Sequence, residues 1–136
     1  SAVGSLIFGR ISDKIGRTKT LKIILACWCV LFLVIAFAPP FAYMIALCLF
    51  AGLFYGPVWG ISRSMVAEFT PPDIAASSFS FYIIAERFAT FVGPIIWSIV
   101  ISATAFSGTR SYSYAIVSMA ILVFLGLIFT RKIKSR

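Results

Sequence analysis

The sequence of 136 residues contains no histidine and few charged side chains. Only 12% of the residues are charged, about half of the roughly 25% that is usual in soluble domains. The lack of imidazole excludes a histidine metal site and a Ser-His-Asp triad, and the four acidic residues show no paired catalytic spacing. We therefore expect that the protein is not an enzyme and that it holds no metal or other cofactor.

Cysteine is scarce as well. Cys27, Cys29 and Cys48 lie in apolar stretches, and the two-residue spacing of the first pair places them on nearly opposite faces of a helix. This placement is typical of small buried apolar residues, so no disulfide is implied. A charged leader with a small-residue cleavage site is also missing, so the sequence shows no signal peptide.

Apolar residues, in contrast, are in excess. Hydrophobic side chains make up 61% of the chain, and 14 residues are phenylalanine. A soluble fold of this length could not bury so much apolar surface. The net charge of +8 would by itself suggest nucleic acid, but beside the apolar content it indicates basic residues at a membrane surface. The composition predicts an all-α integral membrane protein in a lipid bilayer and excludes a soluble domain, a disordered chain and a nucleic-acid partner.

Two proline pairs divide the apolar sequence. Pro39-Pro40 interrupts a charge-free run of 40 residues between Lys22 and Arg63, because adjacent prolines cannot lie inside a helix. Pro71-Pro72 precedes Asp73, a candidate N-cap. At about 20 residues per span, the predicted order is the tail of a truncated helix over 1–11, a cytoplasmic loop over 12–20, transmembrane helices over 21–38, 41–67, 73–104 and 112–130, and a cytoplasmic tail over 131–136.

The positions of the basic residues predict the orientation. Of the 12 Lys and Arg residues, Arg110 lies on one side of the predicted membrane and Arg87 lies inside a span. The other ten share the opposite side: Arg10, Lys14, Arg17, Lys19, Lys22, Arg63, Arg131, Lys132, Lys134 and Arg136. Basic loops face the cytoplasm, so we expect these loops and the C-terminus to be cytoplasmic. Because the chain begins at Ser1 within an apolar pattern, we also expect it to be a piece of a longer protein.

The segment from Gly9 to Lys19 reads GRISDKIGRTK and joins two apolar stretches. Gly9 would let a neighbouring helix approach closely, and Gly16 permits a tight reversal. Asp13 can accept hydrogen bonds from the N-terminus of a neighbouring helix, and Arg17 and Lys19 would hold the loop at an anionic leaflet. The basic residues alone are equally typical of a generic turn, whereas the full spacing favours a gating loop. Its candidate residues are Gly9, Asp13, Lys14, Gly16, Arg17 and Lys19.

This spacing resembles the signature loop of the major facilitator superfamily, which lies between its second and third helices and recurs between its eighth and ninth. The Arg-Thr-Lys ending departs from the consecutive basic residues that are more usual there. With four full spans following, the resemblance implies the C-terminal part of a twelve-helix fold, from the end of helix eight through helix twelve. It also implies that the missing N-terminal part of the same transporter is a partner.

The predicted helix over 41–67 carries a stripe of small residues. Gly52, Gly56 and Gly60 recur every four residues and would permit close packing, while Pro57 would loosen the helix. Two of its aromatic residues, Tyr55 and Trp59, are spaced to share one face and are candidates for lining a solute cavity. They are equally typical of core or interfacial aromatics. Arg63 is interpreted as an anchor at the cytoplasmic surface.

The predicted helix over 73–104 carries two ionisable residues inside an apolar span. Arg87 is a candidate contact for a solute carboxylate or phosphate, and Thr90 lies on the same face. Glu86 would be the counter-charge of Arg87 or a carboxylate that couples transport to protons. Alternatively, both charges extend to the cytoplasmic headgroups. Gly93-Pro94 is interpreted as a hinge.

The segment from Gly60 to Pro94 is also similar to the vacuole-effluxer-like branch of the superfamily, related to a fungal autophagy permease. The residues that carry this similarity are Gly60, Ser62-Arg63-Ser64, Pro71, Phe79, Phe81-Tyr82, Phe91 and Gly93-Pro94. The resemblance implies a permease that moves a small solute by alternating access, with amino acids as the expected substrates.

The sequence contains no phosphate-binding loop, so the energy for transport would come from protons, another ion or the solute itself. The expected location is a cell inner, plasma or vacuole membrane. The alternatives are a small four-helix membrane scaffold or assembly protein and a drug or sugar permease of the same superfamily.

Overall fold

The computed structural model describes residues 2–37 and 40–132. In this part of the chain the elements are α1 (Ala2–Ile15), α2 (Arg17–Ala36), α3 (Phe41–Phe69), α4 (Ala75–Ala103) and α5 (Arg110–Arg131), with 3-10 turns at Pro72–Ile74 and Ala105–Ser107. Four segments are long and apolar enough to cross a membrane: α2, α3, the segment Pro72–Ala103 that contains α4, and α5. The fold is therefore all-α, as predicted.

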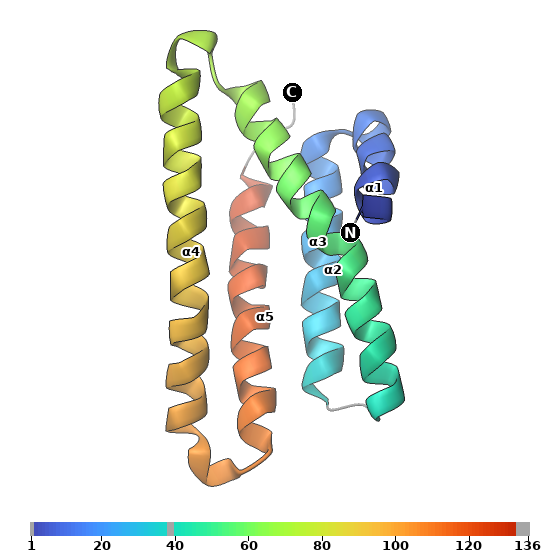
Figure 1. Ribbon diagram of the computed structural model, residues 1–136, viewed down its shortest axis with the longest axis vertical. Helices are drawn as coiled ribbons and strands as arrows, with labels where there is room; N and C mark the ends of the chain where they lie inside the picture. Colours follow the sequence, from blue (N-terminus) through green and yellow to red (C-terminus); the bar gives the residue numbers. More distant parts are fainter. Residues whose placement is uncertain (1, 38–39, 133–136) are drawn as a thin grey trace.

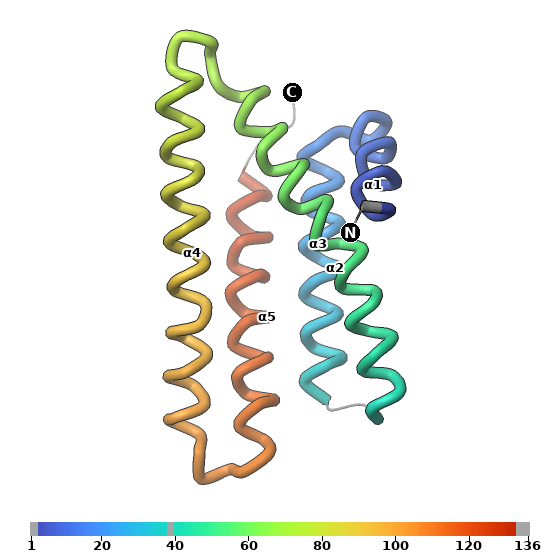
Figure 2. Tube along the Cα trace, in the orientation of Figure 1, coloured from blue at the N-terminus to red at the C-terminus, as the bar shows by residue number. Residues whose placement is uncertain are grey.

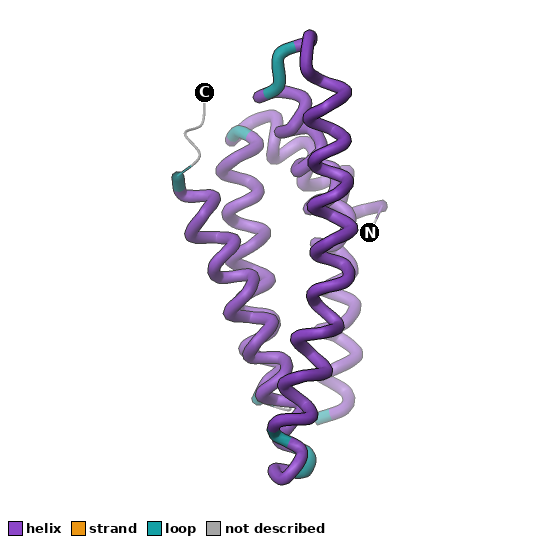
Figure 3. The backbone as a smooth tube through the Cα atoms, turned by 90° about the vertical axis from the view of Figure 1, so that its left-hand side faces the viewer, coloured by secondary structure: helices purple, strands orange, loops and turns teal. Residues whose placement is uncertain are grey.

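The helices form an elongated bundle with two parts. Figure 1 shows α4 and α5 as an antiparallel pair beside α1, α2 and an oblique α3. The same path is visible in Figure 2, where α1 crosses α3. The view turned by 90° in Figure 3 shows the connections gathered at the two ends of the bundle. One end, called the basic end below, holds Gly16, the connection over 70–74 and Arg131.

The turn between α1 and α2 corrects the predicted loop over 12–20. Helix α1 continues to Ile15 and α2 begins at Arg17, so only Gly16 lies outside a helix. Gly16 adopts a positive φ of 99°. Its N–H donates to the carbonyl of Ser12 at 2.9 Å, and its carbonyl accepts from the N–H of Thr20 at 3.1 Å. A glycine in this conformation turns the chain in one residue while both helices keep their terminal hydrogen bonds, so a longer loop is not needed.

The other boundaries differ from the predictions by a few residues. Pro40 precedes α3, which begins at Phe41 as predicted and ends at Phe69 rather than at residue 67. The predicted N-cap is wrong, because Asp73 lies in the 3-10 turn and Ile74 precedes α4 without a side-chain cap. Pro71 and Pro72 start this turn first, and the α-helix follows it. Ala38, Pro39 and residues 133–136 of the predicted tail lie outside the described residues.

The core lies among α1, α2 and α3. The buried cluster consists of Leu21, Ile24, Phe54, Ile61 and Met65, with Phe8 of α1 packed against it. Ile24 is fully buried, whereas α4 contains no buried residue. The ring centroids of Phe8 and Phe54 are 5.2 Å apart, which brings α1 onto the middle of α3. This packing fixes the turn at Gly16 relative to α3.

The close approach of α1 to α3 occurs at Gly4. A Cβ placed on Gly4 would overlap the carbonyl oxygen of Leu53. This carbonyl is four residues before Pro57, which lies inside α3 and has no N–H to donate to it. The backbone of α1 therefore packs against a carbonyl that the proline leaves without its helical partner. The sequence alone does not reveal the role of Gly4, because its partner is 49 residues away along the chain.

The glycines predicted to pack helices together behave differently from Gly4. A Cβ on Gly9, Gly52, Gly60 or Gly93 would meet nothing within 4 Å among the described residues. Among the described residues, the close contact predicted at Gly9 is therefore absent. Helix α1 meets α3 at Gly4 instead, which lies more than one helical turn before Gly9. The packing role of Gly52 and Gly60 stays a prediction.

Candidate functional site

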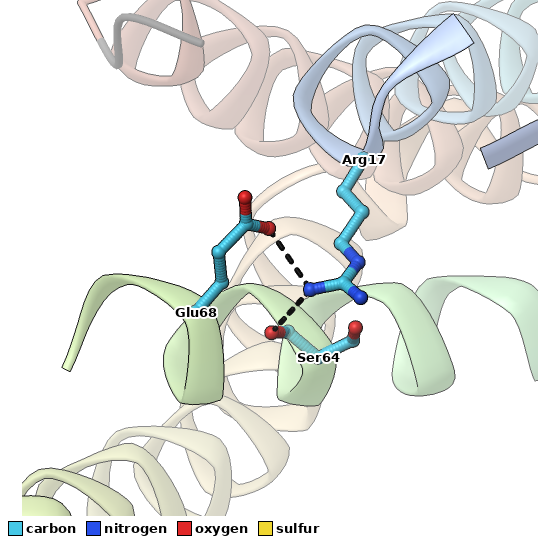
Figure 4. Close-up of polar contacts among 3 residues, drawn as sticks. All are labelled: Arg17, Ser64 and Glu68. Atoms are coloured by element: carbon cyan, nitrogen blue, oxygen red, sulfur yellow. Dashed lines mark hydrogen bonds and ion pairs between the residues drawn. The ribbon is translucent and has the colours of Figure 1, made fainter. Parts of the chain in front are cut away.

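The first polar site connects the turn at Gly16 to α3. Arg17, the first residue of α2, forms an ion pair with Glu68 of α3, and its Nη1 atom lies 2.9 Å from Oε2. The same Nη1 donates to the carbonyl oxygen of Ser64 at 3.4 Å. Figure 4 shows the guanidinium between these two acceptors. The side chains of Arg17 and Glu68 are 39% and 40% exposed, so this pair is partly screened and its main effect is to set a geometry.

Sequence reasoning missed Glu68. A usable signal was present, because Glu68 is an acidic residue at the end of a span that was predicted to reach the same membrane surface as the basic turn. What the sequence could not give is the rotation of α3 about its axis. That rotation decides which helix face meets Arg17, and it is set by the packing of Ile61 and Met65 in the core.

Two hollows flank Arg17 at the basic end. A pocket of about 170 Å³ lies between α1 and α3, and its lining includes Gly9, Ser12, Asp13, Arg17 and Gly60. A second one of about 390 Å³ shares Ser12, Asp13 and Arg17 and extends to Glu68. Asp13 therefore faces both hollows, and it forms no hydrogen bond or ion pair with any residue that the structure describes. The predicted acceptor role of Asp13 toward a helix N-terminus has no partner within residues 2–37 and 40–132.

The remaining basic residues of the predicted gating loop are exposed. Lys14 is the last basic residue of α1, and Lys19 lies in the first turn of α2. Within the described ranges, neither forms an ion pair. Of the three basic residues in this loop, Arg17 is thus the one that the fold holds in place.

A second polar site joins α3 to α4. Nη2 of Arg63 lies 3.6 Å from Oε2 of Glu86. The guanidinium of Arg63 also lies over the ring of Trp59, 5.5 Å from its centroid, which is a cation–π arrangement. The Glu86 side chain is only 14% exposed, and its Oε2 atom is buried without a hydrogen-bond partner among the described residues. Glu86 is therefore a largely buried carboxylate beside one arginine.

This arrangement corrects one of the alternatives predicted for Glu86, that it is the counter-charge of Arg87. The other alternative, coupling to protons, stays a prediction. The described part of the chain contains the ion pair of Glu86 with Arg63 and none with Arg87. Adjacent residues on a helix point about 100° apart, so when Glu86 faces α3 the side chain of Arg87 does not. Arg87 is exposed. Arg63 does more than anchor the helix, since it contacts both a neighbouring helix and an aromatic ring.

The hydroxyl of Thr90 is engaged locally. Its Oγ1 donates to the carbonyl of Glu86 at 2.9 Å, the i−4 bond that is common for threonine inside helices. Arg87 and Thr90 lie one turn apart on the exposed side of α4. Helix α4 continues through Gly93 and Pro94 as a single element, although Pro94 cannot donate to the carbonyl of Thr90. The hinge at Gly93-Pro94 stays a prediction.

The aromatic candidates face an apolar hollow. Tyr55 and Trp59 have ring centroids 6.3 Å apart. Both line a pocket of about 270 Å³ between α2, α3 and α5, and the other lining residues are Leu25, Trp28, Phe32, Val58 and Val123. Tyr55 remains 58% exposed. Both interpretations of these aromatics, cavity lining and apolar packing, are compatible with this position.

The fold and the sites define the class of protein. Four apolar segments of membrane length make it a multi-pass integral membrane protein. Residues 1–136 match the Major Facilitator Superfamily, and the chain belongs to this family. The superfamily is a class of transporters rather than enzymes.

One relative can be named. The chain is 30% identical over 89 residues to "Efflux pump azaK" of Aspergillus niger, an alignment that covers 65% of this chain and 19% of that protein. The chain thus spans about a fifth of the length of the curated relative that it matches. No solved structure matches.

Proposed function

We propose that the chain is the C-terminal portion, from the end of helix eight through helix twelve, of a permease that moves a small solute by alternating access. The observation that carries this proposal is the attachment of the Gly16 turn to α3 through Arg17, Ser64 and Glu68. A turn held in this way transmits a displacement of α1 and α2 to α3. The superfamily match favours the permease over a small membrane scaffold.

The proposal assigns roles to the other candidate residues. The basic end faces the cytoplasm, because it gathers most of the Lys and Arg residues. Asp13 braces a gate there by accepting hydrogen bonds from the N-terminus of a helix that belongs to the rest of the transporter. Helix α3 lines the solute cavity with Tyr55 and Trp59, and Gly52, Gly56 and Gly60 pack against further helices. Helix α4 bends at Gly93-Pro94 during the cycle.

Amino acids are the first candidate substrates. The support is Arg87, whose guanidinium is exposed and unpaired among the described residues and which suits a carboxylate. The similarity to the vacuole-effluxer-like branch points the same way, and a vacuole or plasma membrane fits it. Glu86 is the candidate for coupling to protons or another ion.

Efflux of another small organic solute is the second candidate. It is favoured by the relative named as an efflux pump and by the apolar pocket beside Tyr55 and Trp59, which suits an apolar or aromatic solute. The two candidates differ in what they require of Arg87, since an uncharged solute does not need a guanidinium.

Uptake into vesicles that contain the full-length protein tests the first candidate. We expect Arg87→Ala to reduce the uptake of radiolabelled amino acids at least about tenfold, because a charge-assisted bond to a carboxylate contributes on the order of 1.5–3 kcal/mol. Arg110→Ala is the matched control, since Arg110 is exposed and lies at the other end of the bundle. Amino-acid uptake that is unchanged in Arg87→Ala would remove Arg87 from the site.

A second measurement addresses the fragment. The 136 residues include only one half-cavity at most, so we expect no solute-specific flux when they are reconstituted alone. Specific flux through this fragment would contradict the two-half mechanism.

A further inference from the structure

The contact between α3 and α4 is confined to the basic end. Helix α4 packs along α5 and also meets α3, but no residue of α4 is buried. Figure 1 shows α3 leaning toward α4 near the connection over 70–74 and diverging from it toward the other end. The position of α4 relative to α3 therefore depends on few side chains. Among the described residues, Arg63 and Glu86 form the one ion pair between these two helices.

Glu86 carries a largely buried carboxylate on a helix that contains no fully buried residue. Its side chain is 14% exposed, while its neighbours Ala85 and Arg87 are exposed. Removing a carboxylate from water is costly unless a cation compensates it. Arg63 supplies that cation at 3.6 Å, and Trp59 limits where the guanidinium can go by stacking beneath it. The Arg63 side chain is 57% exposed, so the preferred geometry of the pair comes from the largely buried carboxylate of Glu86 and from the ring of Trp59.

The end of α3 is held by ion pairs on two faces. Glu68 pairs with Arg17 of α2, and Arg63 pairs with Glu86 of α4. Five residues on a helix correspond to a rotation of about 140°, so the two pairs extend in different directions from α3. A displacement of the Gly16 turn is thereby transmitted to α3 by the first pair and can reach α4 through the second.

We propose that Arg63 and Glu86 are a positioning pair that ties the basic-end half of α4 to α3, so that α4 follows the Gly16 turn and α3 as one unit. The proposal rests on the permease function given above and adds a coupling between helices to it. Neither residue needs to touch the solute for this role. Arg87, although adjacent to Glu86, takes no part in it.

Hydrogen–deuterium exchange of the full-length protein in lipid nanodiscs tests this coupling without any solute. In Glu86→Gln and in Arg63→Gln, we expect the backbone amides over 79–90 to exchange about tenfold faster, while α5 is unchanged, because the contact that holds this half of α4 is lost. The reversed pair, Arg63→Glu with Glu86→Arg, should return the rates to within about threefold of the wild type. Arg87→Gln is the matched control and should leave them unchanged.

Three results would overturn the proposal: unchanged exchange in both single variants, a reversed pair that exchanges as fast as the single variants, or an equal effect of Arg87→Gln. If Glu86→Gln does not insert into the membrane, Arg63→Gln and the reversed pair still test the same contact. A failure of this experiment is distinguishable from a failure of the permease function, because exchange rates are measured without transport.

Discussion

Helices α2 and α4 are both apolar helices of membrane length, yet they relate to the bundle in opposite ways. Helix α2 buries five residues, among them the fully buried Ile24, and contacts α1, α3 and α5. Helix α4 buries none, and Ile99, Phe88 and Phe91 are each at least 60% exposed. Apolar composition therefore places a helix in the membrane but does not determine which helices it packs against. Among the described residues of α4, Glu86 forms an ion pair with another helix, whereas Ser80 and Thr90 donate hydrogen bonds within α4.

The largest expected difference between the two helices concerns isoleucine. Truncation of the fully buried Ile24 to alanine leaves a cavity in the α1–α3 core and should lower the free energy of unfolding by about 3 kcal/mol. Ile99→Ala on α4 removes the same atoms from a side chain that is 60% exposed, and should cost less than about 1 kcal/mol.

Thermal unfolding of the full-length protein in detergent compares the two variants. Equal shifts in the unfolding temperature would mean that Ile99 is packed as tightly as Ile24, for instance by helices outside this chain. The contrast between α2 and α4 would then not hold for the full-length protein.

The next effect concerns two glycines of α1. The Cβ of Gly4→Ala would overlap the carbonyl oxygen of Leu53, so α1 must move away from α3, at a cost of about 2 kcal/mol. Gly9→Ala is the matched control in the same helix, because nothing lies within 4 Å of its Cβ. It should be neutral or stabilise by up to about 1 kcal/mol through helix propensity. The reverse order of the two unfolding temperatures would contradict the crossing at Gly4.

The smallest effect concerns the exposed ion pair at the basic end. Arg17→Gln and Glu68→Gln should each destabilise by less than about 1 kcal/mol, because both side chains are about two-fifths exposed and screened. A double-mutant cycle measured at low and at high salt should give a coupling that shrinks with salt. Lys19→Gln, which removes an unpaired charge from the same turn, is the control and should show no coupling with Glu68→Gln.

Much of the fold could be predicted from local features. The proline pair before Asp73 separates α3 from α4, and the positive φ of Gly16 occurs where the sequence predicted a reversal. Charge-free runs indicated the spans to within a few residues. The loop over 12–20 was overestimated because basic and small residues are as compatible with helix ends as with a loop. A glycine turn that preserves the hydrogen bonds of both helices leaves no local mark beyond the glycine itself.

The sites were predicted less well, for a specific reason. The turn residue Arg17 was identified, but its partner Glu68 was not. For Glu86, a pairing with Arg87 was one of the predicted alternatives, whereas the structure pairs it with Arg63. Sequence proximity favours Arg87, whereas the helix geometry turns adjacent side chains away from each other. Gly4 was missed because its contact depends on a carbonyl that Pro57 leaves free in another helix.

Hydropathy, charge placement and proline breaks are enough to predict a multi-pass membrane protein, because these features act locally and need no partner. The superfamily was predicted from the resemblance of the segment from Gly9 to Lys19 to a signature loop, and the match over residues 1–136 confirms it. The tertiary structure decided which helices touch and which charges pair. Those choices depend on how each helix is rotated about its axis, and this rotation is set by the packing of side chains far apart in the chain. The few charged residues of the sequence therefore find their partners only in the folded bundle, where Arg17 pairs with Glu68 and Arg63 pairs with Glu86.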